Sequence, residues 1–295
     1  MYRLRPYQQQ AADVAVRYFK DRTTTANGIM VLPAGSGKSL VIADIAARLG
    51  APVLVFQPSK EILEQNYAKL CAYDILECAV YSASCNSKAI SRITFATIGS
   101  VKNHVEEFSH FRYVIVDECH LVNPKEGMYR DFFKATRCKI IGLPATPYRL
   151  YSTRNGAVLR FITNTSPRVF SRLLFFVQIG YLFGQGYLAK LNYYRIPLID
   201  LNRLRRNSTG ADYTDDSVQR EYRRVSFNDG VLNIVRRLLR VNRRGILLFS
   251  RFVEEAQYIS DSLPGMAAIV SQNTPKKERE RILADFKAGR IKVVT

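Results

Sequence analysis

The sequence contains no tryptophan, only three histidines and only five cysteines among its 295 residues, so tyrosine and phenylalanine carry the aromatic content. The cysteines form no Cys-x-x-Cys pair and the histidines complete no zinc spacing, which argues against a zinc site and against a disulfide framework. Reduced, mostly buried thiols in a cytoplasmic protein are therefore expected at positions 71, 78, 85, 119 and 138. A signal peptide is absent, and no apolar run approaches the roughly 18 residues of a membrane span, so no membrane partner is expected.

Acidic residues are scarce relative to basic ones. The chain has 25 Asp and Glu against 44 Lys and Arg, which gives a net charge of +19. Residues 1–150 hold 19 basic and 13 acidic side chains, whereas residues 151–295 hold 25 and 12, so the second half carries most of the excess. A basic surface of this size favours a polyanionic partner, usually nucleic acid. The alternative is a basic protein whose charge only keeps it in solution.

Short apolar runs alternate with helix-period segments through residues 1–150. The runs are nearly continuous in apolar residues, as expected for strands covered on both faces. Amphipathic helices are predicted between them at Ser39–Leu49 and Ser59–Leu70. This alternation predicts an α/β fold with a parallel sheet. The predicted strands are Gly28–Leu32, Val53–Phe56, Ile93–Thr97, Tyr113–Val116 and Ile140–Leu143.

The alternation of apolar runs and helical segments is absent from the sequence of residues 151–225 and resumes at about residue 226. The middle region reads as a basic linker or insertion. Its run Arg203–Arg206 is either a solvated loop or a contact to nucleic acid, and the sequence does not separate the two. Beyond it, helices are predicted at Val231–Val241 and Val253–Leu263, with another that starts at Thr274-Pro275. The predicted strands there are Gly245–Phe249, Met266–Val270 and Ile291–Val294.

The run Pro33-Ala34-Gly35-Ser36-Gly37-Lys38-Ser39 lies between a predicted strand and a predicted helix. Small residues let the backbone curl so that several N–H groups point at one phosphate, and the helix start adds its positive dipole. Lys38 would reach the β- and γ-phosphates of ATP, and the Ser39 hydroxyl would bind Mg²⁺. The generic pattern begins with a glycine where this chain has Leu32, but the strand–turn–helix context predicts a phosphate-binding loop.

Two adjacent carboxylates, Asp117 and Glu118, follow the apolar run Tyr113–Val116. Carboxylates at the end of a buried strand need partners, because burying them unpaired is costly. Asp117 holding Mg²⁺ and Glu118 activating the attacking water would satisfy both. An ATP-hydrolysing site with Lys38 is therefore predicted.

With these residues in view, the sequence resembles superfamily 2 helicases and translocases of the DEAD/DEAH type. Asp-Glu-Cys-His at Asp117–His120 resembles the box that names the family, and the phosphate-binding loop resembles motif I. Among subgroups, the sequence most resembles the bacterial RadD-like DNA-repair helicases, over residues 3–150 and about 226–295. Further matches follow in the family's order at Arg5–Gln8, Gln57–Lys60, Thr97–Ser100, Ala145–Pro147 and Phe249–Arg251.

The resemblance implies a role for each matched residue. Arg5 and Gln8 would contact the adenine, and His120 would couple hydrolysis to movement of the lobes. Ala145 and Thr146 lie in the motif that couples hydrolysis to strand movement, and Ser250 and Arg251 lie in a motif of the second lobe. Contacts to the nucleic-acid backbone are implied for Pro58, Ser59, Lys60, Thr97, Gly99 and Ser100.

The resemblance also implies two RecA-like lobes, the first at 1–150 and the second beginning at 226. We expect the second lobe to be incomplete, because its last predicted strand ends at Thr295 and the family's motifs V and VI would follow. Motif VI supplies arginines that can be worth about 10³–10⁵ in rate. We therefore expect the chain alone to turn ATP over slowly.

The expected function is an ATP- and Mg²⁺-dependent helicase or translocase, with DNA favoured over RNA and a role in repair or recombination. Two alternatives stay open. One is a duplex translocase or remodeller that does not separate strands. The other is a nucleic-acid-binding or annealing module that ATP only regulates.

Overall fold

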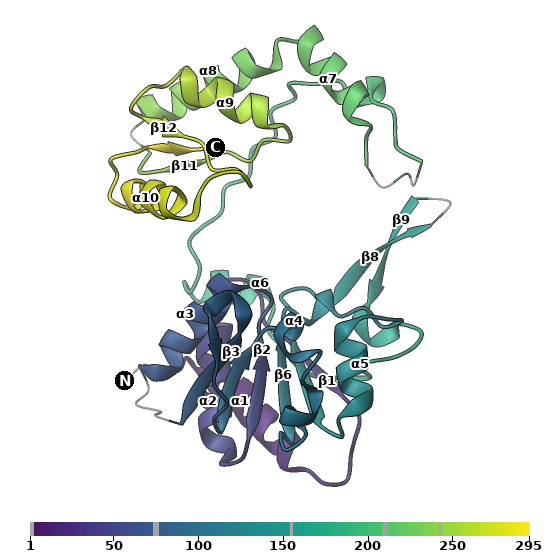
Figure 1. The fold of residues 1–295 in the computed structure, drawn as a ribbon. Helices are drawn as coiled ribbons and strands as arrows, with labels where there is room; N and C mark the ends of the chain where they lie inside the picture. Colours follow the sequence, from purple (N-terminus) through teal and green to yellow (C-terminus); the bar gives the residue numbers. More distant parts are fainter. Residues whose placement is uncertain (1–2, 73–76, 154–155, 209, 211, 242) are drawn as a thin grey trace. The chain divides into compact units, whose positions relative to one another are not determined.

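The computed structural model describes residues 3–72, 77–153, 156–208, 210, 212–241 and 243–295 (Figure 1). The chain divides into two compact units. Unit 1 comprises Met1–Tyr151 and Ala157–Asn192, and unit 2 comprises Ser152–Gly156 and Tyr193–Thr295. Each unit is described separately. In the described part of the chain, no helix combines the length and the apolar character that crossing a membrane requires.

Unit 1 is built on an eight-stranded sheet with the order β10-β1-β7-β6-β2-β5-β3-β4. All of its pairings are parallel except that of β3 with β4. The parallel α/β fold expected from the sequence is confirmed. The strands are β1 (Gly28–Val31), β2 (Val53–Phe56), β3 (Cys78–Ser82), β4 (Ser87–Lys88), β5 (Ile93–Ala96), β6 (Tyr113–Asp117), β7 (Lys139–Leu143) and β10 (Arg172–Phe176).

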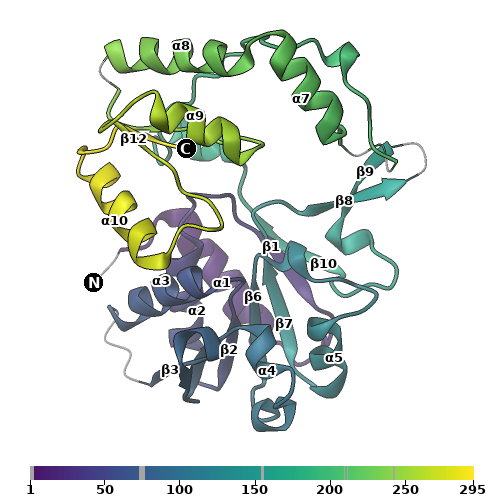
Figure 2. The same cartoon turned by 45° about the horizontal axis from the view of Figure 1, so that its top comes forward.

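Side chains alternate between the two faces of this sheet along each strand, so both faces carry apolar residues. Helices cover each face. In β2, Val53 and Val55 pack in one core with α1, α2 and α3, whereas Leu54 and Phe56 pack in a second core with α4 and α5. The course of these helices can be followed in Figures 1 and 2. Both cores are therefore closed off from water. The helices are α1 (Pro6–Lys20), α2 (Lys38–Leu49), α3 (Lys60–Cys71), α4 (Ile98–Val101), α5 (Met128–Ala135) and α6 (Ile179–Gly184).

Unit 1 extends beyond residue 150, where the sequence analysis ends the first lobe. In the expected linker, β8 (Tyr148–Thr153) and β9 (Gly156–Phe161) form a two-stranded sheet. The strand β10 then pairs in parallel with β1 and becomes an edge of the main sheet. Its partly buried Leu174 and Phe175 pack against the core of α1 and α2, which explains why this segment joins unit 1.

Unit 2 has a three-stranded parallel sheet with the order β11-β13-β12 and a small core of its own. The predicted strand–helix alternation is present, although the strands are shorter than predicted. The elements are β11 (Ile246–Leu247), β12 (Ala267–Ala268), β13 (Val293–Val294), α7 (Asp215–Arg224), α8 (Phe227–Arg240), α9 (Val253–Asp261) and α10 (Lys276–Lys287). Short 3-10 helices are η1 (Ala83–Cys85), η2 (Val105–Phe108), η3 (Cys119–Leu121), η4 (Ile162–Asn164) and η5 (Leu201–Arg203).

The five cysteines are free thiols, as expected. The expectation that most of them are buried is wrong, because only Cys119 is buried and Cys71 is exposed. Cys119 packs against Gly142 of β7, where an added Cβ would lie 2.4 Å from its sulfur. Burial raises the pKa of the Cys119 thiol well above its usual value. Cys119 therefore acts as a packing residue.

Candidate active site

The phosphate-binding loop connects β1 to α2 through two glycines with positive φ. Gly35 has φ of +77° and Gly37 has φ of +78°, a region that side chains rarely adopt. An added Cβ at Gly37 would lie 2.4 Å from Nε2 of Gln8, and one at Gly35 would lie 2.7 Å from Leu188. The loop then enters α2 at Lys38. The backbone forms the curled turn that the sequence predicts, and the positive φ at both positions favours glycine.

Residues at the start of α1 bind the backbone of this loop. The Tyr7 hydroxyl and Gln8 Nε2 each donate a hydrogen bond of 2.7 Å to the carbonyl of Ser36. The Arg5 amide donates to Gln8 Oε1 at 2.8 Å, and the Arg5 guanidinium lies over the ring of Tyr187 at 4.2 Å. Both ends of the buried Gln8 amide are therefore used within the protein. The structure brings Arg5 and Gln8 to the loop, and their contact with adenine stays a prediction.

Lys38 joins the loop to the two predicted carboxylates. Its ammonium pairs with Glu118 and lies 3.6 Å from Oδ1 of Asp117. Asp117 is only 4% exposed at the end of β6. Burial raises the pKa of its carboxyl, which the nearby Lys38 charge opposes. Residues 80 positions apart in the sequence thus form one charged site.

Glu118 has an unusual backbone, with φ of 48° and ψ of 46°. The left-handed conformation is uncommon for a residue with a side chain and is often found at functional sites. Its amide donates to the Leu143 carbonyl at 3.1 Å and to Asp117 Oδ1 at 3.0 Å. These bonds stabilise the turn that aims Glu118 at Lys38. His120 lies beside it, with Nδ1 3.2 Å from Glu118 Oε2.

The site has the groups that a nucleoside triphosphate and Mg²⁺ require. The buried Ser36 hydroxyl has no hydrogen-bond partner within the described chain. Ser39, the predicted metal ligand, accepts a hydrogen bond of 3.2 Å from the ammonium of Lys69, a residue that the sequence analysis did not single out. Among the described residues, no three His, Cys, Asp or Glu side chains form a metal cluster. Mg²⁺ often binds through one or two protein groups together with substrate phosphates, which fits Ser39 and Asp117.

A buried amide that the sequence analysis missed links Asp117 to the next motif. Asn66 Nδ2 donates to Gln57 Oε1 at 3.0 Å and to Asp117 Oδ2 at 3.4 Å. Asn66 is 4% exposed and shares the inward face of α3 with Leu63 and Leu70. A polar residue at a core position of a helix is the signal that could have identified it.

Replacing Asn66 with alanine should destabilise the protein by about 1–3 kcal/mol, because it removes a buried donor shared by two acceptors. Chemical denaturation by urea would measure the loss. Gln65→Ala is the matched control, since Gln65 is an exposed amide on the same helix. Equal stability of the two variants would show that Asn66 is dispensable for positioning Asp117.

The predicted nucleic-acid contacts of unit 1 meet at the ends of β2, β3 and β5. The Thr97 hydroxyl forms hydrogen bonds with the hydroxyl of Ser100 at 3.0 Å and with that of Ser82 at 3.2 Å. Lys60 donates to the Ser84 carbonyl at 2.6 Å. Ser82 and Ser84 were missed, because nothing in their local sequence marks them. The result is a cluster of hydroxyl groups beside a lysine.

Two other predicted residues of this region, Ser59 and Gly99, matter through the backbone. Ser59 caps α3 by accepting a hydrogen bond from the Ile62 amide at 3.4 Å, directly after Pro58. A Cβ at Gly99 would meet no atom within 4 Å, so this position is open. The space around Gly99 would let another molecule approach the backbone closely.

Ala145 and Thr146 follow β7, one strand away from the phosphate-binding loop. The carbonyl of Pro144, just before them, accepts a hydrogen bond of 3.1 Å from the Leu32 amide at the start of the loop. Thr146 is exposed and Ala145 is half-buried. The predicted coupling motif is therefore joined by its backbone to the nucleotide site.

Ser250 and Arg251 lie in unit 2, between β11 and α9. The Arg251 guanidinium pairs with Asp215 at 2.9 Å and with Asp212 at 3.1 Å, and donates to the Tyr213 carbonyl at 2.8 Å. Arg251 thus ties the start of α7 to the end of β11. A role for Ser250 and Arg251 in nucleic-acid contact or coupling, as their place in a motif of the second lobe implies, stays a prediction, and any new contact of Arg251 would have to replace these bonds.

Residues 1–149 match the family described as type III restriction enzyme, res subunit. The chain belongs to this family. The match begins before Gln8 and ends after Thr146, so it includes the phosphate-binding loop, Asp117 and Glu118. Tyr187 and Leu188, which contact Arg5 and the loop, lie beyond it. The expected likeness to superfamily 2 helicases is confirmed at the level of the family, whereas ATP hydrolysis by this chain and the specific likeness to the RadD-like group stay predictions.

Relatives of known description support this placement. The chain is 26% identical over 269 residues to a 51.5 kDa protein of Lactococcus phage (isolate 7-9), covering 89% of this chain and 53% of the relative. It is 25% identical over 300 residues to a putative DNA 3′-5′ helicase Rad25 of Haloarcula marismortui, covering 98% and 44%. A DNA 3′-5′ helicase XPB of Kineococcus radiotolerans is 27% identical over 304 residues, covering 98% and 49%. The chain thus spans about half the length of these relatives.

A solved structure with a similar fold is the helicase domain of Hef from Pyrococcus furiosus. The TM-score is 0.56 at 15% identity, and the similarity covers 99% of this chain and 85% of that one. At this identity the likeness concerns the fold alone.

Proposed function

We propose that the protein is an ATP-dependent helicase or translocase that acts on DNA. The observation that carries the proposal is the ion pairing of Lys38, from the phosphate-binding loop, with Glu118 and Asp117 at the end of β6. A lysine at the start of a helix, with two carboxylates beside it at the end of a strand, suits phosphoryl transfer from a nucleotide to water.

In this proposal each residue has a definite task. The amides of the glycine loop and Lys38 would hold the β- and γ-phosphates, and Ser39 and Asp117 would hold Mg²⁺. Bound Mg²⁺ offsets the negative charge of those phosphates. Glu118 accepts the proton of the attacking water. Lys38 must leave Glu118 for the phosphates before Glu118 can serve as a base, so nucleotide binding would itself release the base.

DNA is the proposed partner for two reasons. The net charge of +19 favours a polyanion, and two relatives are described as DNA 3′-5′ helicases. The hydroxyl groups of Thr97 and Ser100, with Lys60, would contact the phosphate backbone, which carries no sequence information. A function in DNA repair and a location in the cytoplasm fit this activity.

Comparing ATP hydrolysis with single-stranded DNA, duplex DNA and RNA tests the proposal. We expect DNA to stimulate hydrolysis more than RNA does, and to bind less tightly as salt rises. Hydrolysis that no nucleic acid changes would contradict a motor and favour a binding module that ATP regulates. Displacement of a labelled strand from a tailed duplex then separates a helicase from a duplex translocase.

A further inference from the structure

Unit 2 contains a pocket of about 220 Å³ whose lining is dominated by arginine. Two of its arginines come from η5 and the segment after it, and two come from α7. The nucleotide site uses none of them, and the family's motifs do not include them. The residues of this arginine pocket are Arg203, Arg205, Ser217, Arg220, Glu221 and Arg224.

The helical spacing of α7 builds one wall. Ser217, Arg220, Glu221 and Arg224 recur at intervals of three and four residues, so their side chains share one face of the helix. The buried Ser217 hydroxyl accepts a hydrogen bond of 3.0 Å from the Arg205 amide. This bond holds the loop that carries Arg203 and Arg205 against the helix.

Glu221 supports the pocket from its buried side. The residue is 4% exposed, and its carboxylate accepts two hydrogen bonds of 2.8 Å from Arg224. It accepts a third, at 3.0 Å, from the Asp200 amide. The bonds from Arg224 and from that amide lower the pKa of Glu221 to about 2. Glu221 is therefore ionised at neutral pH and fixes the Arg224 guanidinium in one orientation.

Positive charge prevails in the lining. Glu221 offsets one of the four guanidinium groups. Arg220 pairs with Asp216 at 2.8 Å and Arg203 lies 3.6 Å from Asp200, but these four side chains are between 45% and 79% exposed. Exposed pairs contribute little and exchange readily for another anion. Within the described chain, the guanidinium of the exposed Arg205 has no ion-pair partner.

We propose that the arginine pocket binds a backbone phosphate of the nucleic acid on which the protein acts. Guanidinium groups present planar pairs of N–H donors that match phosphate oxygens. The inference rests on the proposed function, because it names a further contact for the same partner. It also assigns a role to the run Arg203–Arg206, for which the sequence left a solvated loop and a nucleic-acid contact equally open.

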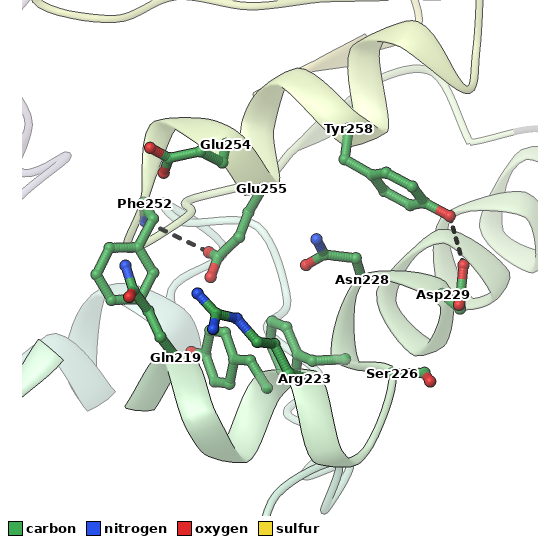
Figure 3. A pocket seen from close by; sticks show the side chains of 11 residues that line it. Gln219, Arg223, Ser226, Asn228, Asp229, Phe252, Glu254, Glu255 and Tyr258 are labelled. Atoms are coloured by element: carbon green, nitrogen blue, oxygen red, sulfur yellow. Dashed lines mark hydrogen bonds between the residues drawn. The ribbon is translucent and has the colours of Figure 1, made fainter. Parts of the chain in front are cut away.

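A larger cavity of unit 2 provides a contrast. Figure 3 shows this cavity of about 440 Å³, between α7, α8 and α9. Its lining includes Asp229, Glu254 and Glu255, with Arg223 as its single basic residue. Glu255 accepts a hydrogen bond from the Phe252 amide at 3.4 Å and keeps its second oxygen buried, without a partner in the described chain. A phosphate would be repelled there, so the arginine pocket is the cavity suited to an anion.

The test replaces Arg205 and Arg220 together with glutamine, a shorter polar side chain, which removes two charges. The matched control is Arg281→Gln with Arg290→Gln, two exposed arginines of unit 2 outside the pocket. The affinity of each protein for single-stranded and duplex DNA is measured at several salt concentrations, and thermal unfolding checks that each variant folds. Relative to the control, we expect about tenfold weaker binding. We also expect the plot of log affinity against log salt concentration to become less steep. Its slope should decrease in magnitude by about 0.7–0.9, the value for one lost phosphate contact.

Affinity and salt slope equal to those of the control pair would overturn the proposal. Inorganic phosphate provides a second arm. If the wild-type chain binds it and the glutamine variant does not, while DNA affinity is the same in both, the pocket serves a free anion and the proposal is wrong. A wild-type chain that binds no nucleic acid would refute the proposed function as well. If DNA stimulates ATP hydrolysis by the wild-type chain, but the DNA affinity and salt slope of the Arg205 and Arg220 variant equal those of the control, only the proposal for the arginine pocket is refuted.

Discussion

Replacing Lys38 with alanine should lower ATP hydrolysis by at least about 10²–10³, the cost of removing one preorganised donor to a developing phosphate charge. Lys38 joins the glycine loop to the carboxylates through its contacts with Glu118 and Asp117. Without its ammonium, two neighbouring carboxylates face the incoming phosphates with no cation between them. ATP binding should weaken together with hydrolysis, because the contact with phosphate exists before the reaction begins.

Equilibrium binding of a fluorescent ATP analogue and steady-state hydrolysis would measure both effects. Lys134→Ala is the control, since Lys134 is an exposed lysine on α5. A Lys38→Ala protein that retained full activity would contradict both the ATPase site and the motor.

Replacing Glu118 with glutamine should separate binding from chemistry. The amide cannot accept a proton from the attacking water, and loss of a general base costs about 10²–10⁴ in rate. Glutamine has the same length and leaves the left-handed backbone and its bond to the Leu143 carbonyl in place. ATP should therefore bind within a few-fold of the wild-type affinity, while hydrolysis within a single turnover nearly stops.

The control for this experiment is Glu126→Gln, which removes one carboxylate from the exposed loop before α5. Hydrolysis at the wild-type rate in Glu118→Gln would assign the base to another residue, with Asp117 the nearest candidate. Lost ATP binding would instead mean that Glu118 mainly orders the loop through Lys38. The contrast between the Lys38 and Glu118 variants is thus more informative than either result alone.

Much of the fold of unit 1 could be predicted from the sequence, because its strands are buried on both faces and read as unbroken apolar runs. The strand at Val53–Phe56 agrees to the residue, and α2 begins one residue before its predicted start. The helix α1 was not predicted, although Tyr7, Ala11 and Ala15 are buried along it. The glutamines at positions 8–10 interrupt the pattern of apolar residues, so the helical spacing is hard to recognise from the sequence.

The candidate site divides in the same way. Lys38, Asp117 and Glu118 could be predicted, because Lys38 follows a glycine-rich turn between a strand and a helix, and the two carboxylates lie at the end of an apolar strand. Lys69 and Ser82 could not, because their importance comes from partners 30 and 15 residues away in the sequence. Asn66 could be marked only as a polar residue on a core face, without its partner Asp117, 51 residues away. Such contacts exist only after the sheet has placed α3 and β3 beside the motifs. Local pattern therefore identifies the reacting groups better than it identifies the groups that position them.

The pairing of β10 with β1 has a consequence for where the nucleotide-binding domain ends. The family match stops at residue 149, but the strand that carries the phosphate-binding loop has β7 on one side and β10 on the other. A chain cut at the family boundary would leave β1 as an open sheet edge, with unpaired backbone groups and a buried apolar surface exposed to water. Edges of this kind recruit strands from other molecules and promote aggregation. The smallest self-sufficient nucleotide-binding piece of this protein is consequently longer than the segment by which its family is recognised.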